Sequence, residues 1–258
     1  MSIVKECLIL AAGNGTRIRQ ASGPLPKPLV EFRGRPLLEH IIRNVRCAGI
    51  ERITIVVGYR SNLIRAWFAQ QWLDGLDVHF VENPDYHRQN GVSALKAKDA
   101  IDGNFLLLMA DHMFETRTAQ RLIRQPLASG EMVLAVDSGI DRVFDLDDAT
   151  KVRRSGRYIV DIGKNISTYD ALDTGMFVCT PALFDTLESV MENGDCSLSD
   201  GMRRLAAAWR FRAFDIGDAE WQDVDTPEAL AHADTMFLNI PPVLQPWVVA
   251  EDSRALRA

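Results

Sequence analysis

The chain has few cysteines, and none of them is spaced for metal binding. Its four cysteines are Cys7, Cys47, Cys179 and Cys196, and no Cys-x-x-Cys motif occurs. A zinc site is therefore not expected, and neither is a disulfide framework. Reduced thiols in a cytoplasmic protein are the expectation instead.

Long apolar runs and an excess of positive charge are also absent. The first apolar run, Cys7–Ala12, is too short for the core of a signal peptide. No run approaches the length of a membrane span, so no span is expected in this chain. The formal net charge is −6. An acidic chain without a basic tract is unsuited to nucleic acid, and its anionic ligands must be met by a few placed cations.

The most informative stretch lies near the start of the chain. The apolar run Cys7–Ala12 predicts a buried strand, and a Gly-Asn-Gly turn at 13–15 follows it directly. The two glycines let the backbone approach a ligand closely and turn its N–H groups toward an anion. Thr16 and Arg17 add a hydroxyl group and a planar guanidinium group, which suit phosphate.

A second motif, Pro26-Lys27-Pro28, holds one lysine between two prolines. Because proline fixes its backbone angle, the ammonium group of Lys27 has little conformational freedom left to lose. Pro36 then begins an apolar periodicity of helical spacing that continues to Val45. Strand, glycine turn, rigid lysine and helix together indicate a site for a nucleoside triphosphate. The P-loop is excluded because no matching Gly-Lys-Ser/Thr string occurs. The dinucleotide fingerprint would need a small residue where Ile18 stands.

Strands and helices alternate along the first half of the chain. Strands are predicted at Ile53–Val57, Val78–Glu82 and Phe105–Met109, and helices at Asn62–Leu73, Val92–Ile101 and Thr116–Ile123. This order predicts an α/β protein with a doubly wound, mostly parallel, Rossmann-like sheet. Ligands of such sheets bind at the carboxyl ends of the strands, where Gly13, Asn83 and Asp111 fall.

Strands dominate after Glu131. They are predicted at Met132–Val136, Ala149–Arg153, Tyr158–Ile162, Leu172–Val178 and Phe211–Phe214, with helices at Pro181–Met191, Ser199–Trp209 and Pro227–Leu238. We expect a β-rich lobe on the same sheet. One domain is expected over residues 1–239, with halves at 1–125 and 126–239, followed by a tail at 240–258 that would suit a linker.

Several carboxylates could contribute chemistry. Asp111 follows a buried strand, and Asp223 and Asp225 share one face of an extended segment. Asp111 or Asp225 could instead only cap a helix, which is a common role for aspartate. The cluster formed by Asp145, Asp147 and Asp148 is expected to be a solvated loop.

Five motifs, taken in order, resemble known nucleotidyltransferases. Gly-x-Gly-Thr-Arg at 13–17, with Pro-Lys-Pro-Leu at a fixed distance, resembles the signature of enzymes that make nucleotide-activated sugars and alcohols. The combination is similar to the CTP:inositol-1-phosphate cytidylyltransferase branch over roughly Ile3–Asn239. The further motifs are Asn90-Gly91-x-Ser93, Ala110-Asp111-His112, Ala149-Thr150-Lys151 with Asp173-Thr174-Gly175, and Asp223-Val224-Asp225-Thr226.

This resemblance implies a GT-A-like fold and a Mg²⁺-dependent cytidylyltransferase. The phosphate or phosphonate of a small alcohol, such as inositol 1-phosphate, would attack the α-phosphorus of CTP, and pyrophosphate would leave. Because the attacking group is already an anion, catalysis needs positioning and charge neutralisation rather than a general base. CTP and the acceptor are the expected partners, and a homodimer is left open.

The resemblance also assigns residues to roles. Arg17 would hold the β- and γ-phosphates, Lys27 the α-phosphate, and Asp111 and Asp225 the Mg²⁺, while His112 could order the Asp111 carboxylate. The expected nucleotide contacts are Leu10, Ala11, Ala12, Gly13, Asn14, Gly15, Thr16, Asn83, Asn90, Gly91 and Ser93. The expected acceptor contacts are Lys151 on the phosphate, Asp173 on the hydroxyl groups, and Thr174 and Gly175 beside them.

Two alternatives stay open. One is a sugar-1-phosphate, phosphocholine or phosphonate nucleotidyltransferase that uses CTP or another nucleotide. The other, from a different class, is a catalytically silent regulatory subunit that binds a nucleotide. The presence of Arg17, Lys27, Asp111 and Asp225 speaks against silence.

Overall fold

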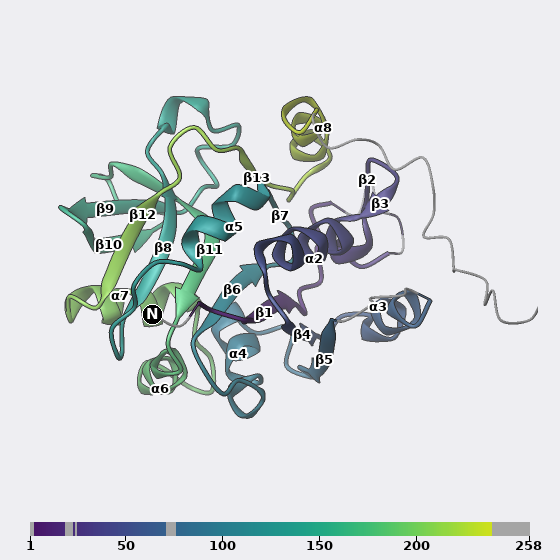
Figure 1. Cartoon of the computed structure of the whole chain (residues 1–258), viewed down its shortest axis with the longest axis horizontal. Helices are drawn as coiled ribbons and strands as arrows, with labels where there is room; N and C mark the ends of the chain where they lie inside the picture. The colour runs from purple at the N-terminus through teal and green to yellow at the C-terminus, as the bar shows by residue number, and fades with distance from the viewer. Residues whose placement is uncertain (1–2, 19–22, 24, 71–75, 239–258) are drawn as a thin grey trace, which may run out of the picture.

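A mixed nine-stranded sheet runs through the computed structural model, which describes residues 3–18, 23, 25–70 and 76–238 (Figure 1). The strand order is β5-β4-β1-β6-β11-β8-β12-β10-β9. The first four of these are parallel: β5 (Asp77–Glu82), β4 (Arg52–Val57), β1 (Glu6–Ala11) and β6 (Phe105–Met109). The predicted α/β class is confirmed, and the ends of β1 and β6 lie side by side.

The second half of the sheet mixes strand directions. β11 (Ala171–Cys179) is antiparallel to β6 and to β8 (Met132–Asp137), whereas β12 (Phe211–Asp215) is parallel to β8. β10 (Tyr158–Gly163) and β9 (Lys151–Ser155) form a hairpin at the edge. The predicted β-rich part therefore extends the same sheet.

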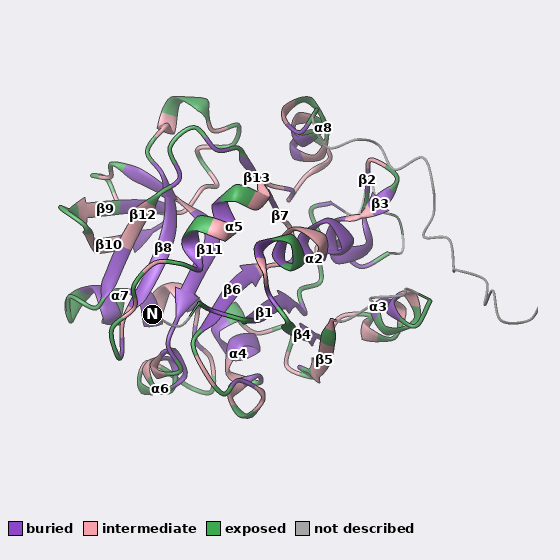
Figure 2. Ribbon diagram, viewed as in Figure 1, coloured by how far each residue is buried: buried purple, intermediate pink, exposed green. Residues whose placement is uncertain are grey.

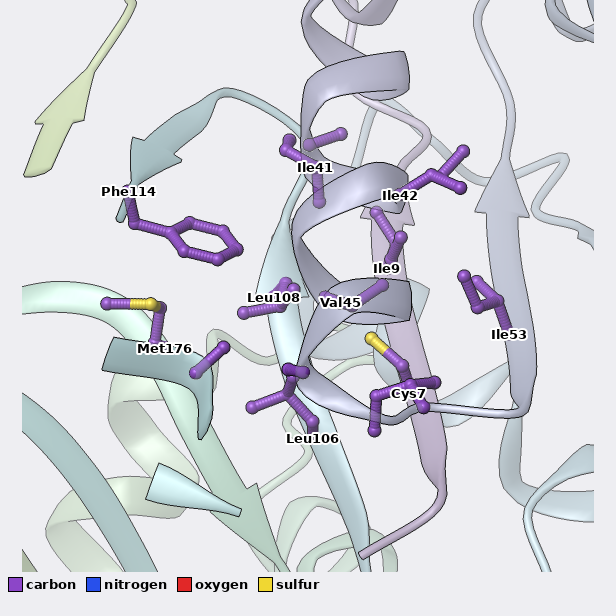
Figure 3. Packing of buried hydrophobic residues seen from close by; sticks show 14 of the residues in the cluster. Cys7, Ile9, Ile41, Ile42, Val45, Ile53, Leu106, Leu108, Phe114 and Met176 are labelled. Carbon is purple, nitrogen blue, oxygen red and sulfur yellow. The ribbon is translucent and has the colours of Figure 1, made fainter. Parts of the chain in front are cut away.

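One face of the sheet is covered by α2 (Leu37–Ala48), α3 (Ser61–Phe68) and α5 (Thr116–Leu122). Side chains alternate along a strand, so every second residue of β1 and β6 faces these helices. Figure 3 shows Ile41 and Val45 of α2 packed over the sheet near Ile9 and Leu108. Burial of each such side chain contributes about 1.5–3 kcal/mol.

The other face is covered by α4 (Asn90–Leu95), α6 (Ala182–Ser189) and α7 (Leu198–Ala207). Figure 2 shows the central strands β6, β8 and β11 almost entirely buried, whereas the edge strand β5 is partly exposed. The prediction of one helix over Val92–Ile101 was wrong, because α4 ends at Leu95 and a short 3-10 turn, η2 (Lys98–Ala100), follows.

Short elements at the carboxyl edge of the sheet complete the fold. β7 (His112–Phe114) pairs with β13 (Trp221–Asp223), and β2 (Glu31–Phe32) pairs with β3 (Arg35–Pro36). They pack with α8 (Pro227–Met236) around a third apolar cluster. That cluster contains Ile18, Val30, Phe32, Leu37, Met113, Val224, Ala233 and Phe237. The remaining 3-10 turns are η1 (Lys27–Leu29) and η3 (Ile140–Arg142).

Two expectations about the ends of the chain are not addressed by the fold. The boundary at residue 239 stays a prediction, and the tail at 240–258 lies outside the described residues. Among the residues that are described, no helix has both the length and the apolar character needed to cross a membrane.

Candidate active site

Lys27 lies among carboxylates at the edge of the sheet. It begins η1 between two prolines, and Leu29 anchors that turn in the core. Its Nζ lies 2.7 Å from Asp111 Oδ2 and 3.6 Å from Asp223 Oδ1, and it also donates to Asp225 Oδ1. Burial alone would lower the pKa of Lys27, but these carboxylates outweigh burial and raise its pKa. The ammonium group is therefore charged.

Asp111 lies two residues beyond the end of β6 and does not cap a helix, since α5 begins only at Thr116. One carboxylate oxygen faces Lys27, and the other lies 2.7 Å from His112 Nδ1. Burial would raise the pKa of Asp111, but the charges of Lys27 and His112 hold it well below its usual range. Burial likewise opposes protonation of His112, yet Asp223 and Asp111 raise its pKa to about 9. Asp111 is thus an ionised carboxylate with a fixed orientation.

Asp223 ends β13, and Asp225 lies just before α8. Thr226 caps α8, because its Oγ1 accepts a hydrogen bond of 3.1 Å from the backbone N–H of Ala229. Asp225 is therefore free to bind Lys27 and Arg17. Burial raises the pKa of Asp223 to about 7, and the negative charge of Asp111 adds to this rise.

The carboxylates fit a divalent cation. Ligand atoms of Asp111, His112 and Asp223 lie within 4.8 Å of one another, as do those of Asp148, Asp223 and Asp225. Asp223 Oδ1 is buried and has no hydrogen-bond partner among the described residues. Oxygen ligands of this kind suit Mg²⁺. The fourth carboxylate, Asp148, belongs to the cluster that the sequence placed in a solvated loop.

A cavity of about 260 Å³ lies beside Lys27. Gly15 has a positive φ of +54°, and a Cβ atom at this position would lie 2.7 Å from the Lys27 Cβ, so only glycine fits. The glycine turn and the lysine are therefore packed as one unit. The cavity is lined by Leu10, Ala11, Gly13, Asn14, Gly15, Thr16, Arg17, Lys27, Pro28, Ala110, Asp111 and Asp225.

Five of the predicted nucleotide contacts are not among the described residues that line this cavity: Ala12, Asn83, Asn90, Gly91 and Ser93. Asn83 is buried and donates to the Ser93 hydroxyl group at 2.9 Å. Asn90 accepts a hydrogen bond of 2.9 Å from the backbone N–H of Leu198 and lines a second cavity. Their contact with a nucleotide stays a prediction.

The second cavity, of about 400 Å³, adjoins the carboxylates, and Asp223 and Asp225 contribute to its wall. Asp173 also lines it, accepting a hydrogen bond of 2.7 Å from Gly175 N–H. Burial raises the pKa of Asp173 to about 6. Thr174 is buried and donates to the Ala135 carbonyl group at 2.8 Å.

Lys151 is not among the described residues that line this cavity. It is buried, and its Nζ donates to the Asp147 carbonyl group at 2.9 Å. Among the described residues, the lysine that lines the 400 Å³ cavity is Lys164. The role of Lys151 at the acceptor phosphate stays a prediction.

Sequence reasoning missed two residues that shape the site. Asp148 accepts from Arg17 at 2.6 Å and from Lys164 at 2.5 Å, so it links cations of the two cavities. Phe144 is about half exposed and stacks on His232 with ring centroids 4.5 Å apart in the larger cavity. Asp148 directly precedes the Ala149-Thr150-Lys151 motif but is not part of it, and Phe144 lies near no motif. Both residues lie in a loop, where no periodicity predicts the direction of a side chain.

A glycine turn, a buried lysine and a group of aspartates at the edge of this sheet are the features of a nucleotidyltransferase. The chain belongs to the family of the MobA-like NTP transferase domain, whose model matches residues 7–213. The resemblance inferred from the sequence motifs is thereby confirmed.

Relatives with names agree with this family. The chain is 37% identical over 233 residues to the bifunctional IPC transferase and DIPP synthase of Rubrobacter xylanophilus, covering 90% of this chain and 51% of that protein. It is 30% identical over 252 residues to the CMP-5'-(3-aminopropyl)phosphonate synthase of Streptomyces rubellomurinus, covering 90% and 38%. The chain thus spans about half the length, or less, of these curated relatives.

Solved structures share the fold. The inositol-1-phosphate CTP transferase from T. maritima superposes with a TM-score of 0.80 at 27% identity, covering 91% of this chain and 95% of that one. A UDP-glucose pyrophosphorylase complexed with UDP-glucose gives 0.78 at 18% identity, covering 92% and 99%. The second likeness shows the fold alone.

Proposed function

We propose that this chain transfers CMP from CTP to the phosphate or phosphonate of a small alcohol and releases pyrophosphate. The observation that carries the proposal is the meeting of Lys27 with Asp111, Asp223 and Asp225 beside the glycine turn. The names of an inositol-1-phosphate CTP transferase and of a CMP-phosphonate synthase support CTP as the donor and a phosphorylated or phosphonylated acceptor.

The nucleotide side is built for charge. In this proposal the triphosphate lies along the glycine turn, with Arg17 at the β- and γ-phosphates and Lys27 at the α-phosphate. Lys27 meets the negative charge that develops there as the acceptor attacks. A Mg²⁺ ion held by Asp111 and Asp225, with Asp223 beside them, would supply further neutralisation of the phosphate charge.

On the acceptor side, an ionised phosphate needs a cation and a fixed direction of approach. Lys164 lines the larger cavity, so we propose it for the acceptor phosphate alongside the earlier expectation for Lys151. Asp173 would accept hydrogen bonds from acceptor hydroxyl groups at the same cavity.

Release of pyrophosphate over a panel of substrates tests the proposal. Four nucleoside triphosphates would be combined with inositol 1-phosphate, 3-aminopropylphosphonate, phosphocholine and glucose 1-phosphate, with Mg²⁺ present. We expect turnover with CTP, weaker turnover with UTP, and less with ATP or GTP. If the chain binds CTP but no combination of nucleotide and acceptor gives turnover, the alternative of a regulatory subunit is favoured. Faster turnover with a purine nucleotide would overturn the assignment of CTP.

A further inference from the structure

Asp137 is a buried carboxylate that the reaction proposed above does not use. It ends β8 and is only 4% exposed. Its Oδ1 accepts from Gly139 N–H at 2.7 Å and from Arg142 Nη2 at 3.0 Å, and its Oδ2 accepts from Trp221 Nε1 at 2.9 Å. Asp137 therefore connects the end of β8 to the indole ring of Trp221 in β13.

The indole ring of Trp221 in turn packs against the imidazole ring of His112. Trp221 begins β13 and is 8% exposed, and its ring lies nearly parallel to the imidazole ring of His112, at an angle of 11° with centroids 6.1 Å apart. His112 also packs against Gly175, where a Cβ atom would lie 2.5 Å from the imidazole ring. The plane of the His112 ring is therefore confined by two neighbours.

His112 in turn orients Asp111. The imidazole Nδ1 lies 2.7 Å from Asp111 Oδ1, while Asp111 Oδ2 faces Lys27 at 2.7 Å. A rotated imidazole ring would release Oδ1 and let the carboxylate turn. The contacts thus form one continuous series from Asp137 through Trp221 and His112 to Asp111.

We propose that Asp137 and Trp221 are positioning residues that hold His112, and through it Asp111, in the orientation needed for the divalent cation and Lys27. The inference rests on the proposed function, in which Asp111 is a cation ligand. Residues that support a metal ligand from behind typically affect metal affinity or activity by about 10–100-fold when replaced.

A purely structural role is the competing explanation, since Asp137 also holds the turn that follows β8. The neighbouring strand β12 provides a control that has the same place at a strand end but is exposed. Asp215 ends β12, where its carboxylate accepts from Gly217 N–H at 2.9 Å and from Arg154 at 3.2 Å. Within the described part of the chain, no hydrogen bond joins Asp215 to a tryptophan ring.

The experiment compares Asp137→Asn, Trp221→Phe, the double variant and Asp215→Asn in the full chain. Trp221→Phe keeps an aromatic ring beside His112 but removes the indole N–H. We expect either single variant to lower kcat about tenfold and to weaken Mg²⁺ binding, measured by calorimetry with Mg²⁺ alone, by a similar factor. The KM for CTP should stay nearly unchanged, and Asp215→Asn should resemble the parent.

Two readouts separate positioning from mere stability. The ¹⁵N chemical shifts of the His112 ring, which report the hydrogen bond at Nδ1, should change in both single variants but not in Asp215→Asn. The double variant should lose no more activity than either single one, because both act through one series of contacts. Variants that lower only the melting temperature, with parental ¹⁵N shifts and Mg²⁺ affinity, would overturn the proposal.

Failure of the proposed function would look different. A parent protein without turnover removes the kinetic readout and overturns the cytidylyltransferase proposal. The Mg²⁺ affinity and the His112 shifts still test positioning in that case. If they change in Asp137→Asn as described, the positioning inference holds on its own.

Discussion

The two cavities that share Asp225 are built from the chain in different ways. The smaller one is lined mainly by one short stretch, 10–17, together with Lys27 and Pro28. The larger one draws its lining from separated segments: the loop after β8, the strands β11 and β13, and the helices α7 and α8. A ligand in the smaller cavity meets mostly backbone and fixed cations, whereas a ligand in the larger one meets side chains from many elements.

This difference has a functional consequence. The lining of the smaller cavity can change only if residues of the glycine turn are replaced. At Gly15 no larger residue fits, because a Cβ atom there would collide with Lys27. A cavity assembled from loops such as 138–150 can accept new side chains without changing the smaller cavity, except at Asp148, which contacts Arg17. We infer that the smaller cavity carries the shared chemistry of the family and the larger one the choice of acceptor, in line with site-based specificity on shared folds. The predictions below test that division.

Asp111→Asn should have the largest effect, because it removes the charge of a proposed cation ligand that also pairs with Lys27. The two side chains are nearly isosteric, so the fold should persist, while turnover should fall by about a thousandfold. Pyrophosphate release at saturating CTP over a range of Mg²⁺ concentrations measures this. Asp185→Asn is the control, since Asp185 is an exposed carboxylate paired with Lys98 at 3.0 Å. A folded Asp111→Asn variant with parental activity at low Mg²⁺ would remove Asp111 from the site.

Lys27→Ala tests the smaller cavity. We expect kcat to fall by about a hundredfold, with a much smaller change in CTP binding, since the lysine acts mainly on charge that develops during the reaction. The three carboxylates around it would also lose their buried partner, so the melting temperature should fall in EDTA and recover partly with Mg²⁺. Steady-state kinetics with Lys5→Ala as an exposed control measures the effect. A change in kcat of only a few-fold would make Lys27 incidental to catalysis.

The contrast between the cavities also explains what the sequence could predict. The turn at 13–17 and the Pro-Lys-Pro motif are each continuous in the sequence, so their residue types were enough to predict a phosphate site. The apolar run before Asp111 likewise predicted that Asp111 lies at a strand end. The pairing of β7 with β13 was missed because three-residue strands are too short to show an alternating pattern.

The direction of side chains was the second feature that the sequence could not predict. Residue type alone could not show that the Lys151 ammonium meets a backbone carbonyl, or that Asp148 bridges Arg17 and Lys164. The cap of α8 is a similar case. Asp225 and Thr226 are both good capping residues, and only the three-dimensional structure shows that Thr226 takes that role and leaves Asp225 for the cations.

Lys164→Ala and Lys151→Ala form a matched pair for the larger cavity. Lys164 lines it, so its loss should raise the KM for the acceptor about tenfold, as expected for one charge-assisted contact, while the KM for CTP stays nearly constant. Lys151→Ala should act more weakly, through the loop that carries Asp148. The opposite ranking would restore Lys151 as the phosphate ligand. An equal rise in both KM values would place the lysine concerned on the nucleotide side.

Asp173→Asn should have the smallest effect on activity, but it tests most directly whether the acceptor carries hydroxyl groups. One oxygen of Asp173 is held by Gly175 N–H, so the other can accept a hydrogen bond from a hydroxyl group. Loss of the charge should raise the KM for inositol 1-phosphate roughly fivefold, the value of about one hydrogen bond, and change that for a phosphonate without hydroxyl groups much less.

The pH dependence provides an internal check on this last prediction. Burial raises the pKa of Asp173 to about 6, so the carboxylate is ionised above that pH and becomes protonated below it. The KM for inositol 1-phosphate should therefore rise as the pH falls through about 6 in the parent protein. The acceptor phosphate titrates in the same range, but that contribution is common to parent and variant. The ratio of the Asp173→Asn KM to the parental KM should thus fall toward one at acid pH. A ratio that is independent of pH would show that Asp173 does not contact the acceptor.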